Sequence, residues 1–215
     1  ENGVVARVIT VSQKLDAQLV LISTGVRPQD ELARECGLLV SPRGGIIVNN
    51  RLQTSDPDIY AAGDCIETTQ LITGKKTFAP LGSLSNRQGR IVADNLAGKH
   101  SCFEGVVGSF IMKAFDVCVG TTGLTLDAAL EEGFEADMSI IVQSDRAHFI
   151  PAHEDIVLVM VFDRISRRVL GVQGFSTMGD GVLARINAAA GLLTKRAVID
   201  DFSVLEMAYA PPFST

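Results

Sequence analysis

The strongest constraint on the fold is a pair of apolar, β-branched runs, 156–162 and 169–175, that flank the charged segment 163–168. Runs of this length that are rich in valine, isoleucine and phenylalanine are typical of β-strands, and a short polar segment between two of them indicates a hairpin. Comparable runs at 109–119 and 138–143 predict two more strands. Because hairpins join strands that run in opposite directions, we expect the second half of the chain to form an antiparallel sheet.

Helical patterns alternate with these strands. The segment 126–132 predicts a short helix that ends at Gly133, and a longer helix is predicted to begin at Asp180, a residue type that suits the N-cap position. A last short helix is predicted over 200–208. Strands in hairpins with helices beside them indicate an antiparallel α+β domain from about residue 103 onward.

The first half of the chain follows a different, α/β pattern. Its 19–23 run is continuously apolar, as expected of a strand that is covered on both faces. A helix is predicted from about Ser83 to Ala97, with Gly98 as its stop. The other predicted elements are strands at 4–11, 46–48 and 59–62 and a short helix at 30–36 capped by Asp30.

Composition limits the kinds of partner that the chain can have. Its 215 residues are 47% hydrophobic and 20% charged, an ordinary balance for a globular protein with a sizeable core. Lysine and arginine are scattered and the formal net charge is -6, so we expect no nucleic-acid partner. The longest apolar run, 156–162, lies between two aspartates and is too short to cross a membrane. The four cysteines form no closely spaced pair, so we expect no metal site and a cytoplasmic protein with reduced thiols.

A turn after the predicted strand 59–62 combines Gly63 with Asp64. Glycine lets a ligand approach the backbone closely, and a carboxylate accepts hydrogen bonds from ligand hydroxyls. Ligands of open α/β sheets bind at strand ends of this kind. From the residues alone two interpretations stay open, a ligand site and a strand that ends in an Asx-turn.

The segment 54–64, Thr-Ser-Asp-Pro-Asp-Ile-Tyr-Ala-Ala-Gly-Asp, resembles the second flavin fingerprint of the pyridine nucleotide-disulfide oxidoreductases. The resemblance implies that Gly63 lies against FAD and that Asp64 holds its ribityl chain. The segment 21–28 is similar to the strand and turn at which the chain of that family returns from the NAD(P)H-binding domain. That similarity implies that Gly25 lies near a cofactor.

The segment 79–90 resembles the helix of the same family whose N-terminus faces the flavin ring. The resemblance implies backbone contacts to FAD from Leu81, Gly82 and Ser83. Free N–H groups and the positive end of a helix stabilise negative charge on a reduced flavin. The alternative for each residue is a surface helix N-terminus without a ligand.

The segments 170–174 and 209–214 resemble the dimerisation domain of this family, in the version found in the coenzyme A-disulfide reductase and NADH oxidase branch. There the tyrosine of Tyr-Ala-Pro-Pro crosses the dimer toward the neighbouring subunit's reactive cysteine and thiol substrate, which implies a catalytic role for Tyr209. A tyrosine packed on prolines is the alternative. The branch usually carries a tyrosine before the proline that matches Pro151, whereas this chain has Ile150 there.

The resemblance implies three regions: a remnant of the NAD(P)H-binding domain with its return strand at 1–24, the C-terminal half of the FAD-binding domain at 25–102, and a dimerisation domain at 103–215. The intact protein would be a homodimer that uses FAD and NAD(P)H to reduce a thiol-type acceptor. Coenzyme A disulfide, a polysulfide and dioxygen are the candidate acceptors.

Glycine loops for dinucleotide phosphates are missing from the sequence, because no Gly-x-Gly-x-x-Gly follows a strand and opens a helix. We therefore expect both ends of the chain to lie inside a longer protein, and the 215 residues alone to bind no flavin. The alternative function is a non-catalytic dimerisation or interaction module.

Overall fold

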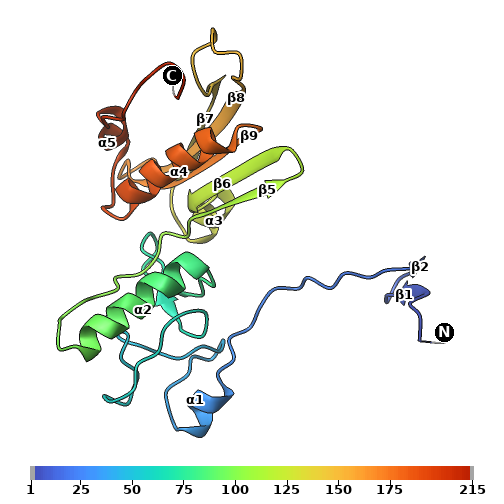
Figure 1. Ribbon diagram of the computed structural model, residues 1–215, viewed down its shortest axis with the longest axis vertical. Helices are drawn as coiled ribbons and strands as arrows, with labels where there is room; N and C mark the ends of the chain where they lie inside the picture. Colours follow the sequence, from blue (N-terminus) through green and yellow to red (C-terminus); the bar gives the residue numbers. More distant parts are fainter. Residues whose placement is uncertain (1–2, 214–215) are drawn as a thin grey trace.

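Residues 3–213 are described by the computed structural model, in two connected parts, one built on a sheet and the other around a long helix (Figure 1). In chain order, the strands are β1 (Arg7–Ile9), β2 (Lys14–Asp16), β3 (Thr68–Thr69), β4 (Lys76–Thr77), β5 (Phe110–Ala114), β6 (Val117–Gly123), β7 (Ala136–Ser144), β8 (Asp155–Asp163) and β9 (Val169–Ser176). The helices are α1 (Glu31–Glu35), α2 (Gly82–Leu96), α3 (Leu126–Glu131), α4 (Gly179–Leu193) and α5 (Ile199–Ser203).

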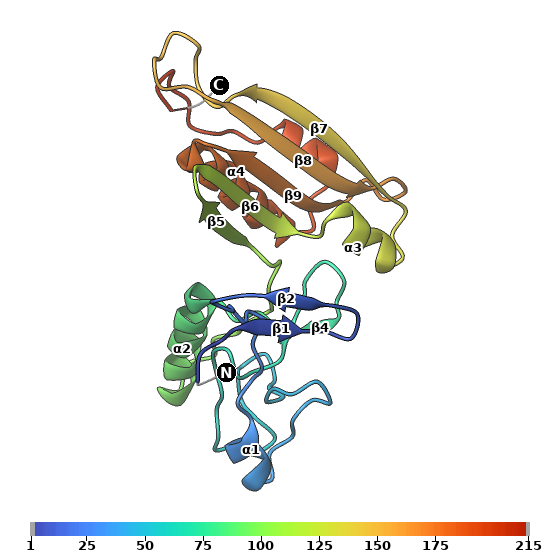
Figure 2. The same cartoon turned by 90° about the vertical axis from the view of Figure 1, so that its right-hand side faces the viewer.

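A five-stranded sheet of order β5-β6-β9-β8-β7 forms the second part, and every neighbouring pair of strands is antiparallel. Figure 2 shows α4 behind this sheet. The core between them contains the fully buried side chains of Leu170, Ile186 and Leu193. At Gly120 on β6 an added Cβ atom would lie 2.8 Å from the Ile186 side chain, so α4 packs directly on the strand. The antiparallel α+β fold of this part, including the hairpin of β8 and β9, is confirmed.

The segment 109–119 was expected to be one strand, and this prediction is wrong. It contains β5, a tight turn and the start of β6, with Phe115 in the left-handed region at a φ of 55°. Turns of this kind usually carry glycine or asparagine, which tolerate a positive φ. Because Phe115 is followed only by Asp116, the sequence has little at this point to mark a reversal of the chain.

The face of the sheet opposite α4 carries an apolar row that crosses all five strands. Met112 pairs with Val119, Val119 with Phe175, Phe175 with Val157, and Val157 with Val142, one residue from each strand. Directly opposed residues of paired strands share a face. Met112, Phe175 and Val142 are 52%, 48% and 61% exposed, so much of this row is open to solvent in the single chain.

The first part contains α2, the small hairpin of β3 and β4, and loops packed around a cluster of Leu52, Ile66, Phe103 and Val106. The α/β sheet expected here is only partial. The strands predicted at 46–48 and 59–62 are reduced to isolated bridges, such as the one between Ile46 and Ile66.

The N-terminal predictions also change. The strand predicted at 4–11 shortens to β1, which pairs with β2 at the far end of an extended segment (Figure 1). The run 19–23 was predicted to be a buried strand, but it is irregular, and Leu21 is 86% exposed. A β-strand needs a hydrogen-bonded neighbour, and no segment among residues 3–213 pairs with this run.

Several helix ends differ from the predicted ones. The last helix, α5, ends at Ser203 rather than at residue 208. Met178, rather than Asp180, occupies the N-cap position of α4, and Asp180 lies in the first turn. Asp30 does precede α1, but its carboxylate accepts hydrogen bonds from Arg34 and from the backbone of Gly45 instead of capping the helix.

Candidate functional site

The turn at Gly63 and Asp64 lies against the first half of α2. Gly63 has a φ of +90°, a conformation that favours glycine, and its N–H donates to Oε1 of Gln88 at 2.7 Å. Ser85 donates from Oγ to Oδ1 of Asp64 at 2.9 Å. Ser85 and Gln88 are three residues apart and therefore share a face of the helix. The helix thus fixes Gly63 and Asp64, the last two residues of the predicted flavin fingerprint.

The Asp64 side chain is exposed, and only one of its two carboxylate oxygens is held by a partner in the described part of the chain. Among the described residues, no hydrogen bond reaches Oδ2, whereas Oδ1 is held by Ser85. Gln88, by contrast, is only 2% exposed, so its amide is a fixed part of the structure. A carboxylate positioned in this way can accept a hydrogen bond from a ligand hydroxyl.

The N-terminus of α2 is adjacent to this turn and is not capped by any side chain of the described residues. The N–H of Leu81 donates to the carbonyl of Ala79 at 2.9 Å, so this amide has a partner within the chain. The N–H groups of Gly82 and Ser83 have none among residues 3–213. The first turn carries no acidic residue, and the space above Gly82 is open. Two free donors at the positive end of a helix form a site for a partly negative group.

A cavity of about 400 Å³ adjoins Asp64 and receives the side chains of Arg27 and Arg43. Phe78 and Pro80 provide apolar walls. Gly25, the remaining predicted cofactor contact, has a φ of +93° and precedes the lining segment by one residue, but it does not line the cavity itself. A carboxylate for hydroxyls, two guanidinium groups for anions and an apolar wall together suit a polar, phosphate-bearing cofactor.

Cys65 follows Asp64 and is half-buried, with its thiol donating to the carbonyl of Ala62 at 3.4 Å. Burial raises the pKa of the Cys65 thiol, and the negative charge of Asp64 raises it further. A reactive cysteine requires a lowered pKa, because the thiolate is the nucleophile. The environment therefore argues against Cys65 as a redox centre.

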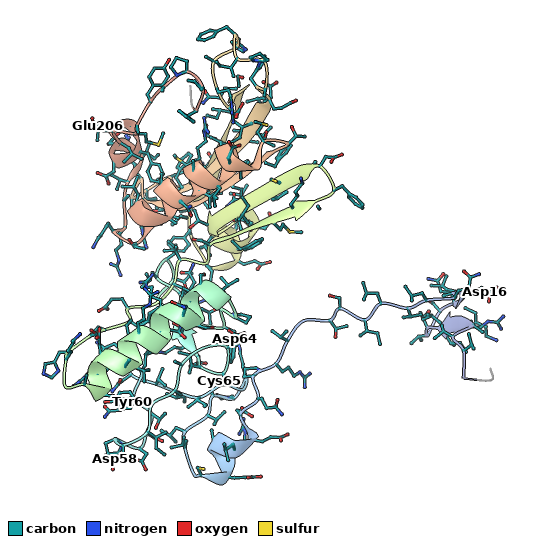
Figure 3. The ribbon with its side chains drawn as sticks, in the orientation of Figure 1. Asp16, Asp58, Tyr60, Asp64, Cys65 and Glu206 are labelled. Atoms are coloured by element: carbon teal, nitrogen blue, oxygen red, sulfur yellow. The ribbon has the colours of Figure 1, made fainter. Side chains whose placement is uncertain are left out.

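Tyr209, the predicted catalytic residue, lies in the other part of the chain and is 67% exposed. Figure 3 labels Glu206, which is close to it in sequence, at the outer side of the sheet part, far from Asp64. The following segment contacts the β7–β8 loop, where the N–H of Ala147 donates to the carbonyl of Pro211 at 3.2 Å. Tyr209 and Asp64 therefore do not form one site within a single chain.

Sequence reasoning missed Ser85 and Gln88, the two residues that hold the turn. The only available signal was their three-residue spacing on a helix that begins at Gly82, 18 residues after Asp64. Of the histidines, His148 and His153 form an edge-to-face ring pair with centroids 5.5 Å apart. No group of residues suited to bind a metal ion occurs within 3–213.

A partial dinucleotide-binding fold joined to an antiparallel α+β domain defines a class of two-part redox proteins. The sequence matches the family of pyridine nucleotide-disulphide oxidoreductases over residues 1–79, and the dimerisation domain of the same family over residues 110–215. The chain belongs to this family, in the branch that contains coenzyme A disulfide reductases and NADH oxidases.

Individual relatives agree. The chain is 40% identical over 210 residues to an NAD(P)H sulfur oxidoreductase (CoA-dependent) of Pyrococcus abyssi, covering 98% of this chain and 46% of the relative. It is 28% identical over 197 residues to a coenzyme A disulfide reductase of Staphylococcus epidermidis, covering 91% of this chain and 44% of the relative. The chain therefore spans somewhat less than half the length of these relatives.

Solved structures show the same fold. An NAD-dependent persulfide reductase from A. fulgidus superposes with a TM-score of 0.91 at 37% identity, over 97% of this chain and 38% of that one. An FAD-dependent pyridine nucleotide-disulphide oxidoreductase from Desulfovibrio vulgaris superposes with a TM-score of 0.80 at 47% identity, over 94% and 48% respectively. Within residues 3–213, no helix has the length and apolar character needed to span a membrane.

Proposed function

We propose that the chain is the C-terminal part of an FAD-dependent NAD(P)H oxidoreductase that reduces a disulfide, persulfide or polysulfide, or dioxygen. On this proposal residues 25–102 supply one side of the FAD site, and residues 103–215 form a homodimer. The observation that carries the proposal is the Gly63–Asp64 turn, which Ser85 and Gln88 hold beside the uncapped N-terminus of α2. The names of the sulfur-reducing relatives favour a sulfur acceptor for this chain.

The residues present fit FAD in three respects. Oδ2 of Asp64 is available to accept a hydrogen bond from a ribityl hydroxyl, because Ser85 holds only Oδ1. The free N–H groups of Gly82 and Ser83 can donate to the pyrimidine edge of a flavin, where charge accumulates on reduction. The cavity beside Asp64 brings guanidinium groups close to this position.

Bound FAD would supply the two-electron chemistry between NAD(P)H and the acceptor. The chain's own contribution is to position and stabilise. Asp64 orients the ribityl chain, while the Gly82 and Ser83 amides stabilise negative charge without having to reorganise. In the dimer, Tyr209 would present its phenol to the thiol chemistry of the neighbouring subunit.

The test is the visible absorption spectrum of the protein extended upstream through both dinucleotide-binding glycine loops, recorded before and after addition of NADH. A flavin band that bleaches on reduction supports the proposal, and Asp64→Ala in that protein should lose flavin. A folded, colourless extended protein that takes up no added FAD would contradict the proposal.

The homodimer rests on the dimerisation-domain match and on the apolar row of the sheet. The most exposed members of this row, Met112, Phe175 and Val142, lie on three different strands and form a continuous patch with the residues between them. An exposed apolar patch of this kind is typical of a protein interface. Sedimentation velocity of the chain at several concentrations should show a dimer, and a strict monomer at all concentrations would contradict this assignment.

A second candidate is a dimerisation or interaction module that binds no flavin. The observation that favours it for this chain alone is the contrast between its two parts. The second part forms a five-stranded sheet among the described residues, whereas residues 19–62 contribute the short helix α1 and isolated bridges but no strand. Flavin binding and dimerisation can be measured separately, so the two candidates are distinguishable.

A further inference from the structure

A buried carboxylate, that of Asp145, lies directly after β7 in a position that the proposed chemistry does not explain. Its residue is 0% exposed. The guanidinium of Arg146 contacts Oδ2 of Asp145 with two nitrogens, Nε at 2.8 Å and Nη2 at 2.7 Å. A buried charge that is held in this way fixes the geometry of its surroundings, because any displacement leaves an uncompensated charge.

Asp145 also joins the two ends of the β7–β8 loop. The N–H of Asp145 donates to the carbonyl of Glu154 at 2.9 Å, and the N–H of Glu154 donates to Oδ1 of Asp145 at 3.0 Å. Residues 145–154 therefore form a loop whose two ends are joined by reciprocal hydrogen bonds.

Hydrogen bonds connect this loop to helix α4. Arg185 donates from Nη2 to the carbonyl of Asp145 at 3.1 Å and from Nη1 to the carbonyl of Gly181 at 3.0 Å. Arg146 reaches Asp180, in the first turn of the same helix, at 3.1 Å. Two aspartates and two arginines thus balance in charge, and α4 itself packs on the sheet.

The loop in turn holds the segment that carries Tyr209. The N–H of Ala147 donates to the carbonyl of Pro211, two residues after Tyr209. On the other side of Tyr209, Leu205 and Met207 line an apolar cavity of about 290 Å³ that Arg185 also lines. The segment after Tyr209 is therefore hydrogen-bonded to the β7–β8 loop, and the segment before it lies beside a cavity that Arg185 also lines.

We propose that Asp145 is a positioning residue for Tyr209. Together with Arg146 and Arg185, Asp145 holds the β7–β8 loop against α4. The loop in turn holds the backbone of the segment that carries the Tyr209 side chain. The role rests on the proposed function of Tyr209, but the physical link can be measured without it. Small misplacements of a catalytic group cost rate steeply, so such a link matters even though Asp145 touches no substrate.

The chain offers a clean optical probe, because it contains two tyrosines and no tryptophan. In a Tyr60→Phe background, tyrosine emission comes from Tyr209 alone. We expect Asp145→Asn to lower the fluorescence anisotropy of Tyr209 toward the value of a free tyrosine peptide. Asp137→Asn is the matched control, since it makes the same change at an exposed position of β7, the strand that precedes Asp145, and should leave the anisotropy unchanged.

Ala147→Pro provides a second variant, which keeps the side chains of Asp145, Arg146 and Arg185 and removes the N–H that reaches Pro211, while it also restricts the backbone at residues 146 and 147. It should lower the anisotropy as well, and circular dichroism should show that it is folded. Unchanged anisotropy in folded Asp145→Asn and Ala147→Pro proteins overturns the proposal. If Asp145→Asn does not fold, the Ala147→Pro result decides alone.

Activity in the extended flavoenzyme gives an independent readout. Asp145→Asn should reduce turnover with the sulfur acceptor by roughly tenfold or more, while the anaerobic reduction of flavin by NADH keeps its wild-type rate. Equal losses in both half-reactions would indicate a general structural defect and contradict a positioning role. An extended protein without flavin would refute the proposed function, yet the anisotropy result would still stand.

Discussion

Arg168 donates a hydrogen bond from Nη1 to the carbonyl oxygen of Ile72 at 3.0 Å, across 96 residues of sequence. Its Nη2 atom donates to the neighbouring carbonyl of Leu71 at 3.2 Å. The Ile72 side chain is 4% exposed and belongs to the apolar core of the sheet part. The tip of the β3–β4 hairpin is therefore packed into the domain that carries α4, and the two hydrogen bonds of Arg168 connect it to that domain.

Because Ile72 and Arg168 connect the two parts of the chain, we expect the two parts to unfold together. Ile72→Ala should lower the free energy of unfolding by about 2–5 kcal/mol, because it leaves a cavity in a packed core. Arg168→Ala should cost about 1–3 kcal/mol through the carbonyls left unpaired. Calorimetry should show a single transition for the wild type that splits or broadens in both variants. Arg164→Ala is the control, because its partner Glu135 is 60% exposed, and a wild type with two separate transitions would contradict the prediction.

The hold of Ser85 on Asp64 predicts graded effects on flavin binding in the extended protein. Ser85→Ala should weaken binding by roughly three- to tenfold, about the value of one hydrogen bond, because it frees the Asp64 carboxylate to rotate. Asp64→Ala should weaken it more. Titration of the apoprotein with FAD, followed by flavin fluorescence, measures both. Asn86→Ala, at an exposed position of the same helix, should bind as the wild type does, and equal losses in Ser85→Ala and Asn86→Ala would point to a general effect on α2.

We expect alanine substitutions at two glycines to change the free energy of unfolding in opposite directions. Gly120 lies on β6 and faces α4, and Gly191 lies within α4. Gly120→Ala would place a Cβ atom 2.8 Å from Ile186 and 2.9 Å from Val182, so it should destabilise the chain by about 1–3 kcal/mol through overpacking. At Gly191, nothing lies within 4 Å of an added Cβ, and the residue is helical. Gly191→Ala should therefore stabilise by about 0.5–1 kcal/mol. Urea unfolding measures both, and a destabilised Gly191→Ala would show that another surface packs there.

The β8–β9 turn predicts a pH dependence of stability. The Ser166 hydroxyl, and secondarily its backbone N–H, donate to Oδ2 of the buried Asp163 and lower the pKa of that carboxyl below its ordinary value of 3.8. A lowered pKa in the folded state means that the stabilisation is present above this value and is lost as the pH falls through the folded-state pKa.

Asp163→Asn should therefore lower the free energy of unfolding by about 1–3 kcal/mol at neutral pH, and the difference from the wild type should shrink in acid. Urea unfolding at a series of pH values measures this. Asp116→Asn, at the exposed turn between β5 and β6, is the control. A difference that stays constant down to strongly acid pH would show that the charge of Asp163 is not involved.

Local patterns predicted much of the second part correctly. The apolar, β-branched runs and the charged turn at 163–168 specified the β8–β9 hairpin, because strand preference and turn chemistry are properties of neighbouring residues. The same holds for α3, which Gly133 follows as expected, and for most of α2. At the candidate site, the turn of Gly63 and Asp64 was evident from the residues and from the resemblance.

Contacts between distant residues were decided only in three dimensions. Nothing in the local sequence indicates that Ser85 and Gln88 hold the turn, that Arg168 bonds to Ile72, or that Asp145 ties a loop to α4. The run 19–23 is a local pattern that misled the prediction. Its apolar residues form a strand only when a neighbouring strand supplies hydrogen bonds. The sequence by itself determined most element types of the second part, the Gly63–Asp64 turn and the family. Tertiary structure decided which of these elements meet, because hydrogen bonds and packing across long stretches of chain depend on partners that no local pattern identifies.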